Sequence, residues 1–239
     1  MPKDGGIGAS SKRREDIRFL TGEGNYTDDI NLHGQAHVFF LRSDIAHGTI
    51  NKIDTSAAEG MPGVLKIFTA ADFEGVGGMP CGWQVTDKHG EAMQEPGHPI
   101  LASGKVRHVG EPMAAVVAET LAQARDAAEA IDVDISELPA VIDMKAALKA
   151  DAPKVHDDLK SNLCYDWGFV EENKAAVEEA FQKAAHVTTL ELRNNRLVAN
   201  PMEPRVAVGD FARGTGEHTL YTTSQNPHVI RLLMGEFVL

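Results

Sequence analysis

Short apolar runs of strand type alternate with short helical patterns along the first half of the chain. Runs rich in β-forming side chains predict strands at 35–43, 49–54, 64–69, 106–109, 113–118 and 133–135. A short helix is predicted from Thr55 or Ser56, with Ser56 as its N-cap. Glu59, three residues later, would complete a capping box, and Gly60 would end the helix.

A longer helical pattern follows Thr120, which is a favourable N-cap residue. The side chains predicted for its buried face are Leu121, Ala124, Ala128 and Ile131. Because such small side chains let a helix lie close to a sheet, we expect helix and sheet to form two packed layers. Residues 75–104, between the strand predictions, are rich in glycine, proline and polar residues, which is typical of a long functional or partner-contacting loop.

The second half of the chain has a separate set of elements. Residues 173–185 carry apolar side chains at helical spacing. Strand-type segments are predicted on both sides of the turn Asn200-Pro201 and again at 216–225. A final helix begins after Asn226, and its apolar stripe continues to the end of the printed sequence. We therefore expect another stretch of polypeptide to complete the layer that this helix covers.

Composition and charge exclude several classes of protein. The net charge of −12 argues against nucleic-acid binding, which needs a basic face to neutralise phosphates. No apolar run approaches the roughly 20 residues of a transmembrane helix. The basic start of the chain lacks the apolar core of a secretory signal, so a cytoplasmic location is expected.

Common catalytic and metal-binding motifs do not occur in this sequence. Cys81 and Cys164 are far apart and lack the spacing of a zinc or iron–sulfur site, so we expect both to be small buried hydrophobic residues. The chain has no nucleophile elbow, no dinucleotide fingerprint after a strand and no phosphate-binding loop. Individual residues alone therefore indicate an acidic α/β protein with one unusual loop.

Six segments, taken together and in this order, resemble one enzyme family. They are "RREDIRFLTGEGNYTDDI", "PGVLKIFTAADF", "KVRHVGEPMAAVVAETLAQARDAAEAIDVDISELPAVID", "VHDDLKSNLCYDW", "NPMEPRVAV" and "TTSQNPHVIR". The family is the molybdenum hydroxylases of the xanthine dehydrogenase and aldehyde oxidase superfamily. The resemblance is to the amino-terminal part of their large subunit, and most closely to the large chain of aerobic carbon monoxide dehydrogenase.

The resemblance implies an α+β fold with two domains after a flexible arm at residues 1–16. Residues 17–145 would form the α/β hammerhead domain, and residues 146–239 the incomplete first molybdopterin-binding domain. The opening segment, residues 13–30, would be a docking segment at a meeting point of subunits, with Gly22, Gly24 and Asn25 forming its turn.

The same resemblance implies an oxidoreductase that works only within a larger complex. The complete large subunit would bind molybdenum as molybdopterin cytosine dinucleotide and oxidise a small substrate with oxygen derived from water. Electrons would pass to a 2Fe-2S cluster on a small subunit and to FAD on a medium subunit. Without the remainder of the large subunit the chain would be inactive, and carbon monoxide, an aldehyde and a purine or other heterocycle all stay open as substrates. The alternative is a catalytically inactive interaction or scaffold protein with the hammerhead fold.

Two residues are candidates for cofactor binding, and the chain contains no counterpart of the catalytic base and no metal ligand. In the family, a glutamine eight residues before the glutamate of the "PMEP" segment reaches the molybdenum centre. Counting back from Glu203 gives Asn195, whose amide is one methylene shorter, and a purely structural amide is an equal alternative. Gln225 is the second candidate. Glu203 and Arg205 are expected to form a structural ion pair or to satisfy buried backbone groups.

Overall fold

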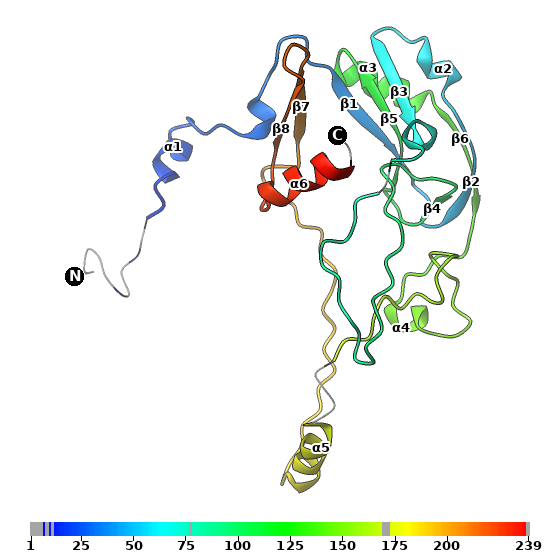
Figure 1. The fold of residues 1–239 in the computed structure, drawn as a ribbon, viewed down its shortest axis with the longest axis vertical. Helices are drawn as coiled ribbons and strands as arrows, with labels where there is room; N and C mark the ends of the chain where they lie inside the picture. The colour runs from blue at the N-terminus through cyan, green and yellow to red at the C-terminus, as the bar shows by residue number, and fades with distance from the viewer. Residues whose placement is uncertain (1–6, 8–9, 11, 77, 169–172, 238–239) are drawn as a thin grey trace. The chain divides into compact units, whose positions relative to one another are not determined.

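The computed structural model describes residues 7, 10, 12–76, 78–168 and 173–237 (Figure 1). Most of the predicted arm at residues 1–16 lies outside these ranges. The chain divides into two compact units. The smaller unit combines the residues up to Gly34 with Arg193–Pro227, and the larger unit combines Gln35–Leu192 with the residues from His228 onward.

Two antiparallel three-stranded sheets form the centre of the larger unit. The strands of the first sheet are, in spatial order, β1 (His37–Arg42), β5 (Pro112–Ala118) and β3 (Val64–Thr69). Those of the second sheet are β4 (Lys105–Val106), β2 (Gly48–Asp54) and β6 (Asp132–Glu137). In the first sheet, Val116 lies opposite Phe39 on one side and Ile67 on the other. Antiparallel sheets combined with separate helices confirm the predicted α+β class.

Helix α3 (Leu121–Glu129) covers one face of the first sheet. The core between them consists of Ala58, Ile67, Ala114, Val116, Ala118, Ala124, Ala127, Ala128 and Ile131. The side-chain oxygen of Thr120 accepts a hydrogen bond from the backbone N–H of Gln123 at 3.3 Å, so the predicted N-cap is confirmed. Leu121 was placed on the buried face but is 41% exposed, because side chains in the first turn of a helix lean towards its N-terminus, away from the packed turns.

A second apolar cluster connects the two sheets. Ala102, Val106 and Met113 are almost completely buried there, and Leu41 and Ile135 pack against them. Since Met113 belongs to β5 and Val106 to β4, this cluster fixes the first sheet against the second.

Short helices and one hairpin complete the described structure. They are α1 (Asp16–Leu20), the 3-10 turns η1 (Thr27–Asp29) and η2 (Ala70–Phe73), α2 (Ser56–Glu59), α4 (Met144–Ala147), α5 (Lys174–Lys183), α6 (Pro227–Phe237) and the β7–β8 hairpin (Ala207–Ala212 and Glu217–Thr222). None of the helices in the described ranges is long and apolar enough to cross a membrane.

The strand predicted before the Asn200-Pro201 turn does not form. Residues 186–199 are extended without ladder pairing, and Leu190 and Leu197 are 74% and 88% exposed. The β-forming composition of this segment is insufficient because a strand is stabilised by a neighbouring strand and by packing on one face. The strand-type segments predicted after this turn and at 216–225 do form, as β7 and β8.

The start of α2 differs from the predicted capping box. Ser56 is the first helical residue, and the carboxylate of Asp54 accepts hydrogen bonds from its backbone N–H at 3.0 Å and its hydroxyl at 2.6 Å. Asp54 therefore performs the role predicted for Ser56. Its pKa is held well below the ordinary value by the hydrogen bond from Lys52 and by the two from Ser56. Gly60 ends the helix as predicted.

The opening segment folds locally into a compact turn. Gly22 adopts a φ of +76°, which favours glycine, and the rings of Phe19 and Tyr26 stack at 5.7 Å. A side chain at Gly24 would place its Cβ 2.6 Å from Phe19 Cδ1, so a glycine is required for the stack. Asp29 closes the turn by accepting a hydrogen bond from the backbone N–H of Tyr26 at 2.8 Å.

The alanine contact between α3 and the sheet leads to a first prediction. Ala124 has 0% exposure, so Ala124→Leu forces extra methylene groups into a filled core and should lower the free energy of unfolding by about 1 to 3 kcal/mol. Ala122→Leu is the matched control, since Ala122 lies on the exposed face of the same helix. Urea unfolding of the purified chain would compare the two. Equal midpoints for both variants would contradict the packing described above.

Candidate functional site

Gln225 lies in the short connection between β8 and α6. The hydroxyl of Ser224 accepts a hydrogen bond from the backbone N–H of Asn226 at 2.9 Å, which shapes the chain immediately around Gln225. The side chain of Gln225 is exposed, and no partner for its amide occurs in the described ranges. Its amide can therefore both donate and accept hydrogen bonds.

The "PMEP" segment meets the end of β8 through one side-chain contact. The hydroxyl of Thr223 donates to Glu203 Oε1 at 3.4 Å, and the hydroxyl of Thr222 donates to the carbonyl oxygen of Val206 at 3.1 Å. Glu203 is half-buried, and its partner Thr223 lies two residues before Gln225 in the chain. Glu203 and Arg205 are expected to form an ion pair or to satisfy buried backbone groups. Within the part of the chain that the structure describes they form no ion pair with each other, and the observed partner of Glu203 is the hydroxyl of Thr223.

Asn195 lies in the extended, exposed segment that precedes the Asn200-Pro201 turn. Its amide has no hydrogen-bond partner among the described residues, and no contact there connects it to Gln225. The structure thus brings Glu203 close to the Gln225 connection, and among the described residues no hydrogen bond links Asn195 to either of them. The cofactor-binding roles of Asn195 and Gln225 stay predictions.

The groups available in the smaller unit are suited to hydrogen bonding. They are two exposed amides, hydroxyl groups and a half-buried carboxylate, which can hold polar atoms of an organic cofactor. Over the described residues, no group of three or more His, Cys, Asp or Glu side chains is placed to ligate a metal ion.

The two cysteines are exposed, which corrects the prediction that both are buried. Cys81 Sγ donates to the carbonyl oxygen of Trp83 at 3.3 Å, and Cys164 Sγ donates to that of Gln94 at 3.1 Å. Both thiols lie in irregular segments, where a position's burial cannot be inferred from helical or strand periodicity.

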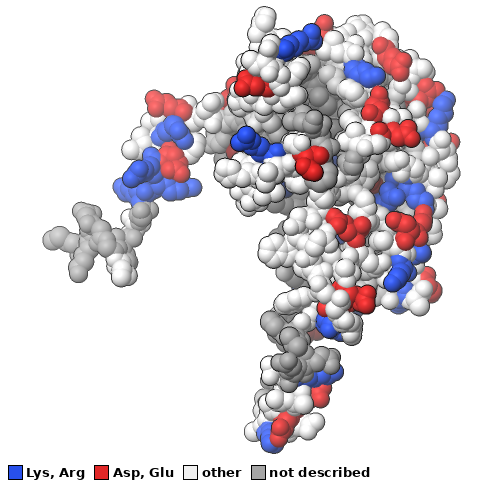
Figure 2. All heavy atoms as spheres, viewed as in Figure 1, with Lys and Arg blue, Asp and Glu red and all other residues white. Residues whose placement is uncertain are grey.

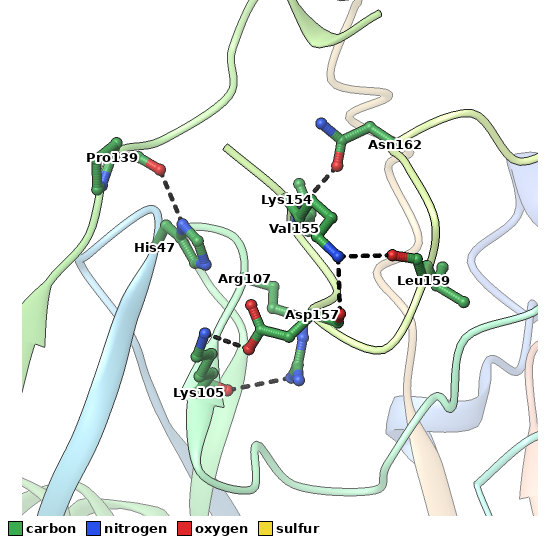
Figure 3. Close-up of polar contacts among 9 residues, drawn as sticks. All are labelled: His47, Lys105, Arg107, Pro139, Lys154, Val155, Asp157, Leu159 and Asn162. Carbon is green, nitrogen blue, oxygen red and sulfur yellow. Dashed lines mark hydrogen bonds and ion pairs between the residues drawn. The ribbon is translucent and has the colours of Figure 1, made fainter. Parts of the chain in front are cut away.

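A polar cluster in the larger unit was missed by sequence reasoning (Figure 3). Lys105 of β4 forms an ion pair with Asp157, and His47 is 6% exposed, with its Nδ1 donating to the carbonyl oxygen of Pro139 at 2.8 Å. His47 Nε2 and Arg107 Nε are buried and have no hydrogen-bond partner among the described residues. These residues come from separate segments and match no motif, so only the folded chain reveals the cluster.

Two sequence profiles match the chain. The profile described as "Aldehyde oxidase and xanthine dehydrogenase, a/b hammerhead domain" matches residues 21–139. The profile described as "Molybdopterin cofactor-binding domain" matches residues 155–238. The predicted domain boundary near residue 145 falls between the two matched ranges and stays a prediction.

Curated relatives and solved structures agree with these profiles. The large chain of carbon monoxide dehydrogenase from Hydrogenophaga pseudoflava is 36% identical over 93% of this chain and 28% of its own length. The nicotine 6-hydroxylase large subunit of Paenarthrobacter nicotinovorans is 34% identical over 97% of this chain and 28% of its own length.

Among solved structures, quinoline 2-oxidoreductase from Pseudomonas putida 86 superposes with a TM-score of 0.83 at 36% identity. This match covers 97% of the present chain and 28% of the matched chain. Carbon monoxide dehydrogenase from Oligotropha carboxidovorans gives a TM-score of 0.78 at 33% identity, over 96% and 29% of the two chains. The chain therefore belongs to the aldehyde oxidase and xanthine dehydrogenase family of molybdenum hydroxylases, and it spans a little over a quarter of the large subunits that it matches.

Proposed function

We propose that this chain is a portion of the large subunit of a molybdenum-dependent hydroxylase or dehydrogenase of the aerobic carbon monoxide dehydrogenase type. The proposal is supported by two family profiles in the same chain and by a carbon monoxide dehydrogenase large chain at 36% identity. Relatives named for nicotine and quinoline are about equally similar, so a heterocyclic substrate is the second candidate.

Exposed apolar side chains are the observation that favours an enzyme portion over a free-standing scaffold. Highly exposed apolar side chains in the second half of the chain include Leu190 (74%), Leu192 (80%), Leu197 (88%), Val198 (86%), Met202 (102%) and Leu232 (72%). A scaffold that folds alone is expected to bury such residues, since large exposed apolar surface indicates an interface. The exposed apolar side chains of these segments, which belong to both units, are therefore best explained by packing against further polypeptide of the same enzyme.

The proposed cofactor is molybdenum bound as molybdopterin cytosine dinucleotide. When bound, this group supplies the oxidation of the substrate with oxygen from water and passes electrons on to 2Fe-2S and FAD in partner subunits. The amides of Asn195 and Gln225 would hold its polar atoms by hydrogen bonds. Glu203, fixed by Thr223, would keep the connection that carries Gln225 in place.

The opening segment is proposed to dock onto an acidic surface of a partner subunit. Lys12, Arg13, Arg14 and Arg18 are all exposed, Arg13 is paired with Asp16, and Figure 2 shows basic side chains next to acidic ones at α1. The guanidinium of Arg18 lies 5.1 Å from the centre of the Phe19 ring, which is itself stacked on Tyr26. A segment that is already shaped in this way loses less conformational entropy when it binds.

The proposed function is tested by isolating the chain from its native source. We expect it to co-purify with the remainder of a large subunit and with iron–sulfur and flavin subunits, and we expect the complex to contain molybdenum. A screen of carbon monoxide, aldehydes and N-heterocycles with a dye acceptor would then identify the substrate. A preparation with the chain alone and without molybdenum would support the scaffold alternative.

The role of Asn195 is tested in that complex. Asn195→Ala should lower turnover per bound molybdenum by roughly tenfold or more, because side chains that support a metal centre commonly contribute that much. Asn195→Gln should retain or raise turnover, since it restores the longer amide. The neighbouring Asn194→Ala is the control. Equal activity of the Asn194 and Asn195 variants would remove Asn195 from the site.

The docking role of the opening segment has its own test. Arg18→Ala should weaken subunit association roughly fivefold, the equivalent of about 1 kcal/mol for one exposed charge pair, and leave the cofactor spectrum unchanged. Arg213→Ala, which removes an exposed arginine from the β7–β8 turn, serves as the control. Association can be followed by analytical ultracentrifugation. A changed cofactor spectrum with normal association would point to a site instead of a docking surface.

A further inference from the structure

Residues 153–168, which we call the strap, run along the long polar loop of the larger unit. The backbone N–H of Lys88 donates to the carbonyl oxygen of Asp166, and that of Gln94 donates to the carbonyl oxygen of Cys164, each at 2.9 Å. The side chains of Lys88 and Asp166 also form an ion pair at 2.6 Å. The strap and the loop are thus held together by hydrogen bonds at two separate points.

One asparagine gives the strap its shape. Asn162 Oδ1 accepts a hydrogen bond from the backbone N–H of Val155 at 2.9 Å, and its Nδ2 donates to the carbonyl oxygens of Pro153 at 2.9 Å and Ala147 at 3.2 Å. The strap between residues 155 and 162 is therefore a closed loop. Its position over the sheets depends on other contacts.

The contacts that hold the strap over the sheets involve charged side chains and lie next to β4. Asp157 at the tip of the strap pairs with Lys105, and Lys154 Nζ donates to the carbonyl oxygen of Asp157 at 3.0 Å. His47, which is buried, donates through Nδ1 to the carbonyl oxygen of Pro139, and within the described part of the chain its Nε2 has no hydrogen-bond partner (Figure 3). The pKa of the Asp157 carboxyl is lowered, first by the hydrogen bond from Lys105 and then by the charges of Lys105, His47 and Lys154.

His156, the neighbour of Asp157, is half-buried at a cavity of about 290 Å³ between the strap and the loop. Burial lowers the pKa of its imidazole, and the charge of Arg107 lowers it further. Three carboxylates act in the opposite direction, those of Asp158, Glu111 and Asp157. The net result favours the neutral imidazole while the strap is closed.

We propose that the strap is an acid-released closure of the larger unit, in which His156 and Asp157 are the groups that take up protons when the strap lifts from Lys105. Lifting the strap would separate it from the long loop at Gln94 and open the cavity to solvent. This inference concerns contacts within the larger unit and does not depend on the proposed enzymatic function.

The direction of the pH effect follows from the two lowered pKa values. His156 regains its ordinary pKa of 6.5 when the strap opens, so the open state binds more protons and opening becomes easier as the pH falls below about 6.5. Asp157 acts in the same direction at lower pH, because its carboxyl regains an ordinary pKa of 3.8. The strap is therefore most firmly closed at neutral pH and above.

Hydrogen exchange measured by mass spectrometry tests the proposal on the purified full chain together with any polypeptide that co-purifies with it. After correction for intrinsic rates, exchange in peptides covering the strap and residues 84–94 should rise on the order of threefold between about pH 7.5 and about pH 5.5. The β1 peptide, residues 37–42, is the internal reference and should keep its protection. Unchanged protection of the strap over this range would overturn the proposal.

Substitutions of His156 and Asp157 test which of the two side chains causes the pH dependence of hydrogen exchange in the strap. His156→Gln should abolish the rise between the two pH values, and Asp157→Asn should speed exchange in the strap at both, because the ion pair with Lys105 is lost. His33→Gln is the control, since His33 is exposed and belongs to the other unit. A His156→Gln chain that keeps the full pH dependence, with β1 still protected, would also overturn the proposal.

Discussion

The close contact between α3 and the central strand β5 is the constraint on which the larger unit depends. Ala114 and Ala118 of the strand face Ala124 and Ala128 of the helix, and all four are at most 1% exposed. With no long side chains between them, helix and sheet come close, and the protein interior tolerates little change in volume there. Because β5 pairs with both β1 and β3 and shares Met113 with the second cluster, the same contact holds both sheets.

Patterns of apolar residues predicted the fold of the larger unit well, since each element there buries a face. The strand at 64–69 and the helix after Thr120 were found at their observed positions for this reason. β4 is shorter than predicted because only Lys105 and Val106 pair with β2. The prediction failed for residues 186–199, where the composition favours a strand but no described neighbour pairs with it.

The polar sites could be predicted to very different extents. Asn195 and Gln225 were proposed through family resemblance, and their positions alone would not have distinguished them from other exposed amides. The cluster of His47, Lys105 and Asp157 could not be predicted at all, because its members are distant in sequence and carry no motif spacing. Burial of His47, the feature that sets it apart, is a property of the folded chain only.

The β7–β8 hairpin has a consequence for how the protein is made. It is a two-stranded sheet, and no third strand pairs with it within the described ranges, so both of its edges present free backbone donors and acceptors. Two-stranded sheets are only marginally stable in water, and open edges invite pairing with other chains. We therefore expect the hairpin to be a point of misassembly during synthesis, which chaperone binding or prompt subunit assembly would prevent. Overproduction of this chain by itself would favour insoluble aggregates.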